Sequence, residues 1–255
     1  TVDCGGAGGR GGVGRLIPPP GWRLRVEEVL PSTQDLLLRL AAAGEPEGLA
    51  VLARRQTAGR GREARSWHSP AGNLHLSVLL RPGGAVRDSA RWSLLAAVAL
   101  AEALAEGTPD PDAIRLKWPN DVLLGPRKLA GVLTECAGDS AGRIEWLVIG
   151  CGANLASAPA VPGREVACLA DLGPTPAPET IAIRLLAALD RWCGESFTAV
   201  RAAWMRRGPA PGSPITLHQA GRTTTGLYAG LAEDGSLLLD TGAGPRAHST
   251  GETGG

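Results

Sequence analysis

Hydrophobic positions recur with two periods along residues 22–151 and predict alternating strands and helices. In NLHLSVLLR (73–81) every second residue is apolar, which is typical of a strand with one buried face. The segment SARWSLLAAVALAEALAEG (89–107) is rich in alanine and leucine and ends at a glycine, which favours a helix. Another helix is expected from residues 32–33, which offer capping hydroxyls, to Gly44. Further strands are expected at residues 22–30, 49–56, 114–118, 121–124, 128–136 and 143–151.

In the second half of the chain, the residue composition and the hydrophobic pattern change twice. Residues 156–178 are rich in proline and alanine and predict a long loop, and residues 179–208 predict one or two helices. After the break at 208–214, short strand-like runs alternate with glycine and aspartate turns, which indicates a small β-barrel packed on the larger domain. The expected units are a glycine-rich disordered lead (1–21), a large α/β (α+β) domain (22–208) and a C-terminal β domain (209–255).

Composition and charge exclude several classes of protein. The 26 basic residues nearly balance the 25 acidic ones, which argues against a dedicated nucleic-acid binder. No apolar run reaches the roughly 18 residues that cross a membrane, and the N-terminal segment lacks the apolar centre of a signal peptide. Five widely spaced cysteines without CxxC suggest neither a disulfide framework nor a zinc site, and they favour the reducing cytoplasm.

Positive charge concentrates in QTAGRGREARSW (56–67). Glycines let a backbone approach a ligand closely, and guanidinium groups bind phosphate or carboxylate through paired hydrogen bonds, so this segment suits an anion. It is not a P-loop, because GxxxxGK[ST] is absent. On this segment alone, a solvated loop without a ligand is slightly favoured, because short motifs often match by chance.

Two later stretches add polar residues at strand ends. In RLKWPNDVLLGPRKLAGVLTE (115–135), Asn120 and Asp121 suit a tight turn between two strands, with Lys117 and Lys128 beside the hairpin. An ordinary hairpin explains the turn but not the two lysines. In VIGCGANLA (148–156), small residues at the strand end would let a flat ligand lie against the backbone.

Taken together, these stretches resemble the biotin–protein ligases, the enzymes that attach biotin to carboxylase subunits. QTAGRGREARSW, KWPNDVLL, RKLAGVLTE and IGCGANL occur in that family's order, STQD (32–35) fits the same pattern, and the resemblance covers about residues 22–252. It implies a mixed-sheet catalytic domain like that of class II aminoacyl-tRNA synthetases, followed by an SH3-like barrel. It also implies that biotin reacts with Mg²⁺-bound ATP to give biotinoyl-AMP, which is then transferred to a lysine of a biotin carboxyl carrier domain.

The resemblance assigns roles to particular residues. It places Arg62 and Lys128 at the reacting groups, where they shield the negative charge that develops at phosphorus. The biotin-binding residues would be Ser32, Thr33, Gln34, Gln56, Arg60, Gly61, Arg62, Trp67 and Lys128. The ATP-binding residues would be Arg62, Arg65, Lys117, Asn120, Asp121 and Asn154, with no metal site of the protein's own and Mg²⁺ carried by ATP near Asp121.

The chain departs from the family pattern in its loop. Ala64 stands where the family often has glycine, and Glu63 where it often has a basic or small residue, so the loop conformation is open. Neither His68 nor His75 shows metal-ligand spacing, and both are interpreted as structural or surface residues. Cys151 is interpreted as a small core residue.

Three other functions compete with this interpretation. A lipoate–protein ligase shares the fold and the acyl-adenylate chemistry. A biotin-sensing repressor would need a DNA-binding helix-turn-helix, which residues 1–21 are too short to form. A non-catalytic biotin-binding scaffold would not need the charges of Lys117, Asp121 and Lys128. No nucleic-acid or membrane partner is expected, and homodimer formation is left open.

Overall fold

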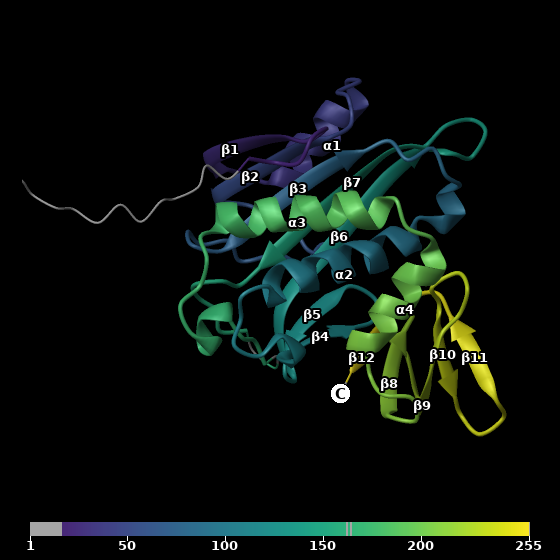
Figure 1. Ribbon diagram of the computed structural model, residues 1–255. Coiled ribbons are helices and arrows are strands. Elements are labelled where there is room, and N and C mark those ends of the chain that lie inside the picture. The colour runs from purple at the N-terminus through teal and green to yellow at the C-terminus, as the bar shows by residue number, and fades with distance from the viewer. Residues whose placement is uncertain (1–16, 162, 164, 255) are drawn as a thin grey trace, which may run out of the picture.

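The computed structural model describes residues 17–161, 163 and 165–254 (Figure 1). The N-terminal lead expected at 1–21 therefore falls mostly outside the described residues. None of the described helices is long and apolar enough to cross a membrane.

Within the described residues, seven strands form a mixed sheet in the order β1-β2-β3-β7-β6-β5-β4. The β1–β2 pair is parallel, and every other neighbouring pair is antiparallel. The strands are β1 (Arg23–Leu30), β2 (Leu49–Gln56), β3 (Leu74–Leu80), β4 (Ile114–Lys117), β5 (Asp121–Leu124), β6 (Arg127–Gly138) and β7 (Ile144–Ala153). This arrangement confirms the mixed α/β architecture and the expected Asn120–Asp121 turn between β4 and β5.

Helices cover both faces of this sheet. The described α-helices are α1 (Thr33–Ala42), α2 (Ala90–Ala105), α3 (Pro178–Cys193) and α4 (Phe197–Arg207). Figure 1 shows α2 and α3 side by side over one face, and the alanines and leucines of α2 fill the larger core there. On the opposite face, α1 buries Leu37 and Ala41 against the alternate strand residues Val51, Leu79 and Val148. Alternation along the strands therefore supplies both faces with apolar side chains.

Within the part of the chain that it describes, the structure adds a helix boundary and three short 3₁₀ turns that the sequence pattern did not predict. Residues 179–208 form two helices because Ser196 caps α4, accepting a hydrogen bond from the Ala199 amide at 3.2 Å. The expected loop at 156–178 contains a 3₁₀ turn, η3 (Leu169–Leu172), and two more such turns are η1 (Val86–Asp88) and η2 (Pro111–Ala113).

Among the described C-terminal residues, five antiparallel strands form a second sheet in the order β11-β10-β9-β8-β12. They are β8 (Pro214–Gln219), β9 (Arg222–Leu231), β10 (Leu237–Asp240), β11 (Pro245–His248) and β12 (Glu252–Gly254). The sheet is open, since β11 and β12 lie at its two ends, so the structure does not confirm the closed barrel.

The second sheet is joined to the first part of the molecule by hydrogen bonds around Trp118. The indole Nε1 of Trp118 donates to the carbonyl of Gly235 at 3.1 Å, and Thr253 Oγ1 donates to the Trp118 carbonyl at 2.8 Å. Trp118 and Thr253 are both buried. The expectation that the C-terminal strands pack on the larger part is thus confirmed.

Candidate active site

A cavity of about 910 Å³ opens on the face of the first sheet that carries α1. Its wall combines the start of α1, the loop after β2, the middle of β3, the β4–β5 turn, and parts of β6 and β7. Glu252 of β12 lies at its border, so both sheets contribute. Of the residues assigned from the sequence, all but Lys117 line this cavity: Ser32, Thr33, Gln34, Gln56, Arg60, Gly61, Arg62, Arg65, Trp67, Asn120, Asp121, Lys128 and Asn154.

The arginine segment folds back on itself as a small hairpin. Arg60 and Ser66 form an antiparallel bridge, and the Arg65 amide donates to the Arg62 carbonyl at 3.1 Å. The two residues at the tip, Glu63 and Ala64, have φ of 54° and 58°. Positive φ at both central positions is the type I′ pattern, which strongly favours asparagine and glycine. The departure from glycine at Ala64 therefore leaves the turn in place, with strained backbone.

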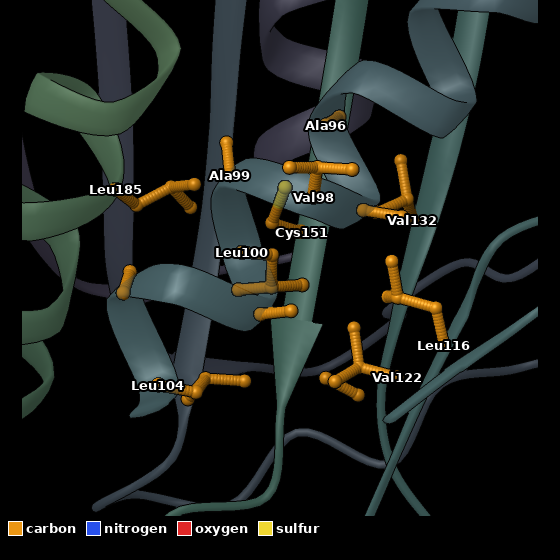
Figure 2. Close-up of a cluster of buried hydrophobic side chains, with 14 of the residues drawn as sticks. Ala96, Val98, Ala99, Leu100, Leu104, Leu116, Val122, Val132, Cys151 and Leu185 are labelled. Carbon is orange, nitrogen blue, oxygen red and sulfur yellow. The ribbon is translucent and has the colours of Figure 1, made fainter. Parts of the chain in front are cut away.

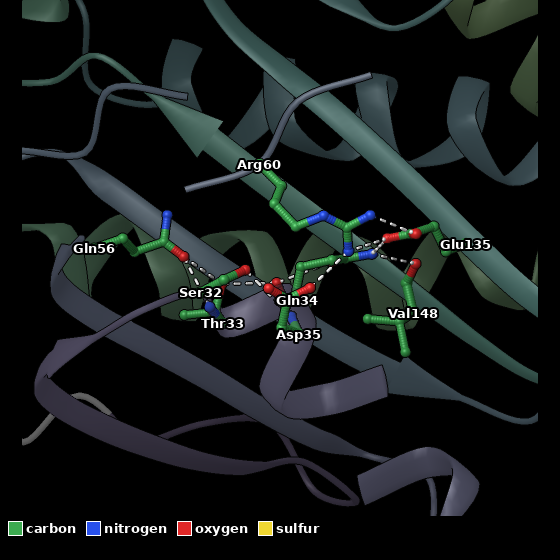
Figure 3. A network of polar contacts seen from close by, with 9 residues as sticks. Ser32, Thr33, Gln34, Asp35, Gln56, Arg60, Glu135 and Val148 are labelled. Carbon is green, nitrogen blue, oxygen red and sulfur yellow. Dashed lines mark hydrogen bonds and ion pairs between the residues drawn. The ribbon is translucent and has the colours of Figure 1, made fainter. Parts of the chain in front are cut away.

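Arg60 is held by two carboxylates (Figure 3). Its guanidinium donates to both oxygens of Glu135 on β6, at 2.9 and 3.1 Å, and to Asp35 of α1 at 2.7 Å. Hydrogen bonding to Glu135 raises the pKa of Arg60 above its ordinary value. The charge of Arg60 is thereby compensated inside the protein, and its side chain ties the loop to α1 and β6.

A chain of hydrogen bonds between uncharged side chains starts at the base of the loop and ends at the Glu135 carboxylate. The Thr33 amide donates to Gln56 Oε1 at 2.8 Å, and Thr33 Oγ1 lies 2.8 Å from Ser77 Oγ. Ser77 donates to Gln34 Oε1 at 3.1 Å, and Gln34 Nε2 donates to Glu135 at 2.9 Å. The chain links the base of the loop to the carboxylate that holds Arg60 (Figure 3).

Two glycines of β7 make room for side chains of the wall. A Cβ at Gly150 would stand 2.6 Å from Gln34 Oε1, and one at Gly152 would stand 2.6 Å from the Trp67 indole. The close approach that the sequence indicated at these glycines is real. However, the flat group against Gly152 is the protein's own Trp67, whereas the sequence analysis expected a ligand there.

Cationic groups gather at the other end. Lys128 Nζ donates to Asp121 at 2.6 Å and lies 5.6 Å from the centre of the Trp67 ring. Arg62 donates to Asn120 Oδ1 at 3.0 Å, and Asn120 in turn donates to the Val132 carbonyl at 2.6 Å. The ammonium of Lys128 and the guanidinium of Arg62 are thus both bonded to the β4–β5 turn, one to Asp121 and the other to Asn120.

Arg65 extends from the loop to the second sheet. Its guanidinium forms an ion pair with Glu252 of β12. Hydrogen bonding to that carboxylate raises the pKa of Arg65 above its ordinary value. The contact makes Glu252 a functional candidate that sequence reasoning missed, because no local pattern near residue 252 points to a partner 187 positions earlier.

The remaining assigned residues lie at the edges of the site. Asn154 is buried, and its side-chain amide donates to the Ala167 carbonyl at 3.1 Å. Lys117 stands opposite Asp121 in the β4–β5 register, hence on the same face of the sheet, but outside the residues that line the cavity. Its nucleotide role stays a prediction.

Sequence reasoning also passed over Ser77 and Glu135, although a signal existed. The leucines of β3 alternate toward the α2 face, which necessarily turns His75 and Ser77 toward the cavity. Glu135 closes the quoted RKLAGVLTE stretch.

Burial favours the uncharged forms of Cys151 and His75. Burial raises the pKa of Cys151 to about 12, so the thiol stays neutral, and its side chain lies beside Val98 in the α2 core (Figure 2). Burial also lowers the pKa of His75 below its ordinary value. Cys151 is thus a core residue, as the sequence indicated. The described cysteines, Cys136, Cys151, Cys168 and Cys193, are all free.

The described residues contain no cluster of three or more His, Cys, Asp or Glu side chains suited to a metal ion. Asp121 and Glu252 are the carboxylates of the cavity wall, and both already have basic partners. One carboxylate beside basic groups fits Mg²⁺ that arrives with phosphate ligands, since Mg²⁺ is commonly held by one or two carboxylates plus substrate phosphates.

Known proteins resemble the chain over most of its length. The model of the biotin/lipoate A/B protein ligase family matches residues 26–154. A biotin–[acetyl-CoA-carboxylase] ligase of Paracoccus denitrificans is 37% identical over 223 residues, which cover 84% of this chain and 92% of that protein. The bifunctional ligase/repressor BirA of Bacillus subtilis is 32% identical over 88% of this chain and 71% of its own length.

Solved structures show the same fold. The biotin protein ligase of Aquifex aeolicus in complex with biotin and ATP superposes with a TM-score of 0.76 at 28% identity, over 91% of this chain and 97% of that one. The biotin protein ligase of Leishmania major in complex with biotinyl-5-AMP gives a TM-score of 0.65 at 25% identity, over 94% and 100% of the two chains.

Proposed function

Because the chain belongs to the biotin/lipoate A/B protein ligase family, we propose that its cavity performs both steps of a biotin–protein ligase. In the first step a biotin carboxylate oxygen bonds to the α-phosphorus of ATP, the bond to the β-phosphate bridge breaks, and pyrophosphate leaves. In the second step the amine of an acceptor lysine attacks the acyl carbon, the bond to AMP breaks, and the amine loses a proton. The observation that carries the proposal is one cavity with a neutral hydrogen-bonding wall and a cationic end.

The neutral wall suits the ureido ring of biotin. A ureido group offers both N–H donors and a carbonyl acceptor, and Ser32, Thr33 and Gln56 present hydroxyl and amide groups of both kinds. Thr33 and Gln56 are hydrogen-bonded to each other, and the Ser32 hydroxyl accepts from the Asp35 amide, so the wall is organised before a ligand enters. A ligand without matching groups would leave buried polar atoms unpaired, which gives selectivity.

The cationic end suits the reacting groups. Attack of a carboxylate on a phosphate brings two anions together, and fixed positive charges lower the barrier as charge develops. Lys128 and Arg62 supply these charges from β6 and the loop. Asn120, Asp121 and Asn154 lie on the same side and would hold the nucleotide. Mg²⁺ would neutralise the phosphates of ATP, with Asp121 as the carboxylate nearest the basic pair.

Other parts of the assignment are coarser. The acceptor is a biotin carboxyl carrier domain, the partner that the reaction requires, and the compartment is the reducing cytoplasm. The catalytic domain spans 22–208, and residues 209–255 form an SH3-like module on an open five-stranded sheet. A lipoate–protein ligase is not favoured, because the named relatives at 30% identity or more are biotin ligases.

The test is ATP–pyrophosphate exchange with the purified chain, run with biotin and separately with lipoate. We expect exchange with biotin only, and biotinoyl-AMP in the product by mass spectrometry. Addition of a biotin carboxyl carrier domain should then give covalent biotinylation, whereas a domain whose acceptor lysine is replaced by arginine should not. Exchange with lipoate and none with biotin would overturn the proposal.

A further inference from the structure

Two buried polar atoms beside the cavity lack a hydrogen-bond partner within the described part of the chain. They are Nε1 of Trp67 and Nδ1 of His75. Both residues line the cavity wall, and His75 is only 1% exposed. Buried polar side-chain atoms in folded proteins nearly always have a partner, so each of these atoms calls for an explanation.

The hydrogen-bonding characters of the two atoms are complementary. His75 Nε2 lies 3.0 Å from the Pro70 carbonyl, which only accepts hydrogen bonds, so Nε2 carries the imidazole proton. Burial lowers the pKa of His75 and keeps the ring neutral. Nδ1 is then an acceptor with a free lone pair. The indole Nε1 of Trp67 is a donor and nothing else.

The sheet register brings these atoms together. His75 of β3 is paired with Gly152 of β7. The Nε1 edge of Trp67 lies 2.6 Å from where a Cβ of residue 152 would stand. Facing Cβ positions on antiparallel strands are about 4.5–5.5 Å apart, and Nδ1 of a histidine lies two bonds from its Cβ. The indole N–H and the imidazole therefore share one face of the sheet, on facing positions of neighbouring strands.

We propose that His75 positions Trp67 by accepting the indole N–H at Nδ1. The bond holds the indole against Gly152, on the face of the sheet where Lys128 lies 5.6 Å from the ring centre. The same register row continues from Gly152 to Gly131 and Asp121, the partner of Lys128. His75 thus acts through Trp67 on the placement of the ammonium that faces the reacting groups, a consequence that rests on the proposed function.

Two substitutions distinguish the roles of the two ring nitrogens of His75. His75→Gln keeps a donor near the Nε2 position, where it reaches the Pro70 carbonyl, and removes the acceptor at Nδ1. His75→Asn places its amide oxygen near the Nδ1 position and so keeps an acceptor. If His75 only fills space, the two variants should behave alike.

The direct readout is the ¹H–¹⁵N indole signal of Trp67, identified among the seven tryptophans by its loss in Trp67→Phe. We expect a hydrogen-bonded, slowly exchanging indole proton in the wild type and in His75→Asn. In His75→Gln the proton should exchange at least about tenfold faster. A freely exchanging wild-type indole would overturn the proposal without any variant, so it stays testable even if one variant fails to fold.

The second readout is ATP–pyrophosphate exchange against biotin concentration. The plateau rate of His75→Gln should fall about fivefold to tenfold, the size expected when one hydrogen bond is lost. His75→Asn should recover most of that rate, and thermal unfolding of both variants checks the fold. Equal plateaus in the two variants would overturn the positioning role. A wild type that shows a protected indole but no exchange with biotin would instead contradict the proposed function alone.

Discussion

Individual charges in the cavity differ in whether the protein already compensates them. Arg60 has two carboxylate partners and Arg65 has Glu252, but Arg62 contacts only the neutral amide of Asn120 among the described residues. A guanidinium without a carboxylate partner retains its attraction for an incoming anion. The sequence placed all three arginines on one loop. Only the structure separates Arg60 and Arg65, which hold the loop, from Arg62, which is available to a phosphate.

Replacement of Arg62 by alanine should therefore damage the chemical step. Removal of one preorganised positive group typically costs about 3 kcal/mol, or a hundredfold in rate. Arg62→Ala and Lys128→Ala should each lower the plateau of ATP–pyrophosphate exchange by about this factor. The matched control is Arg206→Ala on the exposed surface of α4, which should keep the wild-type rate.

Replacement of Gln56 should have the opposite kinetic signature. Gln56 belongs to the neutral wall, away from the reacting atoms, so Gln56→Ala should raise the biotin concentration at half-saturation and change the plateau less. If Gln56→Ala instead lowers the plateau while Arg62→Ala only shifts half-saturation, the two roles are reversed.

His75 should also make the stability of the fold depend on pH. Burial lowers its pKa from the ordinary 6.5, the nearby charge of His68 lowers it further, and the Pro70 carbonyl opposes this. As pH falls below about 6.5, His75 becomes protonated in the unfolded chain before it does in the folded chain. The free energy of unfolding therefore falls as pH falls below about 6.5. Urea unfolding at several pH values between 7 and 5 measures this dependence. The free energy of unfolding should change less with pH in His75→Gln than in the wild type. His218→Gln, which replaces an exposed histidine, serves as the control. An unchanged pH dependence in His75→Gln would contradict a buried neutral imidazole.

At the scale of elements, hydrophobic periodicity located what is long and regular. The α2 helix and the strands β3 and β7 lie close to where the pattern predicts them, because a longer run carries enough positions for its apolar pattern to show in the sequence. The strands β11 and β12 were missed because four and three residues are too few to show a period. The loop hairpin was missed for a different reason. Its tip uses Glu63 and Ala64 at positive φ, where turn preferences call for asparagine or glycine.

That tip is a natural place to test the hairpin. A left-handed conformation costs a residue with a Cβ roughly 1–2 kcal/mol, part of which a glycine loses again through its greater freedom in the unfolded chain. Ala64→Gly should therefore raise the free energy of unfolding by up to about 1 kcal/mol. Ala58→Gly, in the same loop but without positive φ, should lower it by a similar amount. Denaturant unfolding measures both, and equal losses in the two variants would show that residue 64 is not left-handed.

At the scale of the whole molecule, the cavity depends on contacts that no local pattern encodes. The motifs identified the residues of the first sheet, because each motif is contiguous in the chain. They did not reveal that Glu135 holds Arg60 across 75 positions or that Glu252 holds Arg65 across 187. The Arg60–Glu135 pair follows from how the loop folds over the first sheet. The Arg65–Glu252 pair follows from how the two sheets pack, and the hydrogen bonds around Trp118 join them. The second sheet is thus part of the site, through one residue of its shortest strand.

The Arg65–Glu252 pair should consequently couple the second sheet to nucleotide binding. Each side chain is about one third exposed, 35% and 36%, so a double-mutant cycle should give a stability coupling of no more than about 1 kcal/mol. The functional effect should be more specific. Glu252→Gln removes the charge that holds Arg65, so the ATP concentration at half-saturation should rise while that for biotin stays near the wild-type value. Glu233→Gln, an exposed turn residue of the same sheet, is the matched control. In an Arg65→Ala background, Glu252→Gln should raise the ATP concentration at half-saturation by less than in the wild type, because one group that it positions is gone. A second loss of equal size in that background would show that Glu252 acts independently of Arg65.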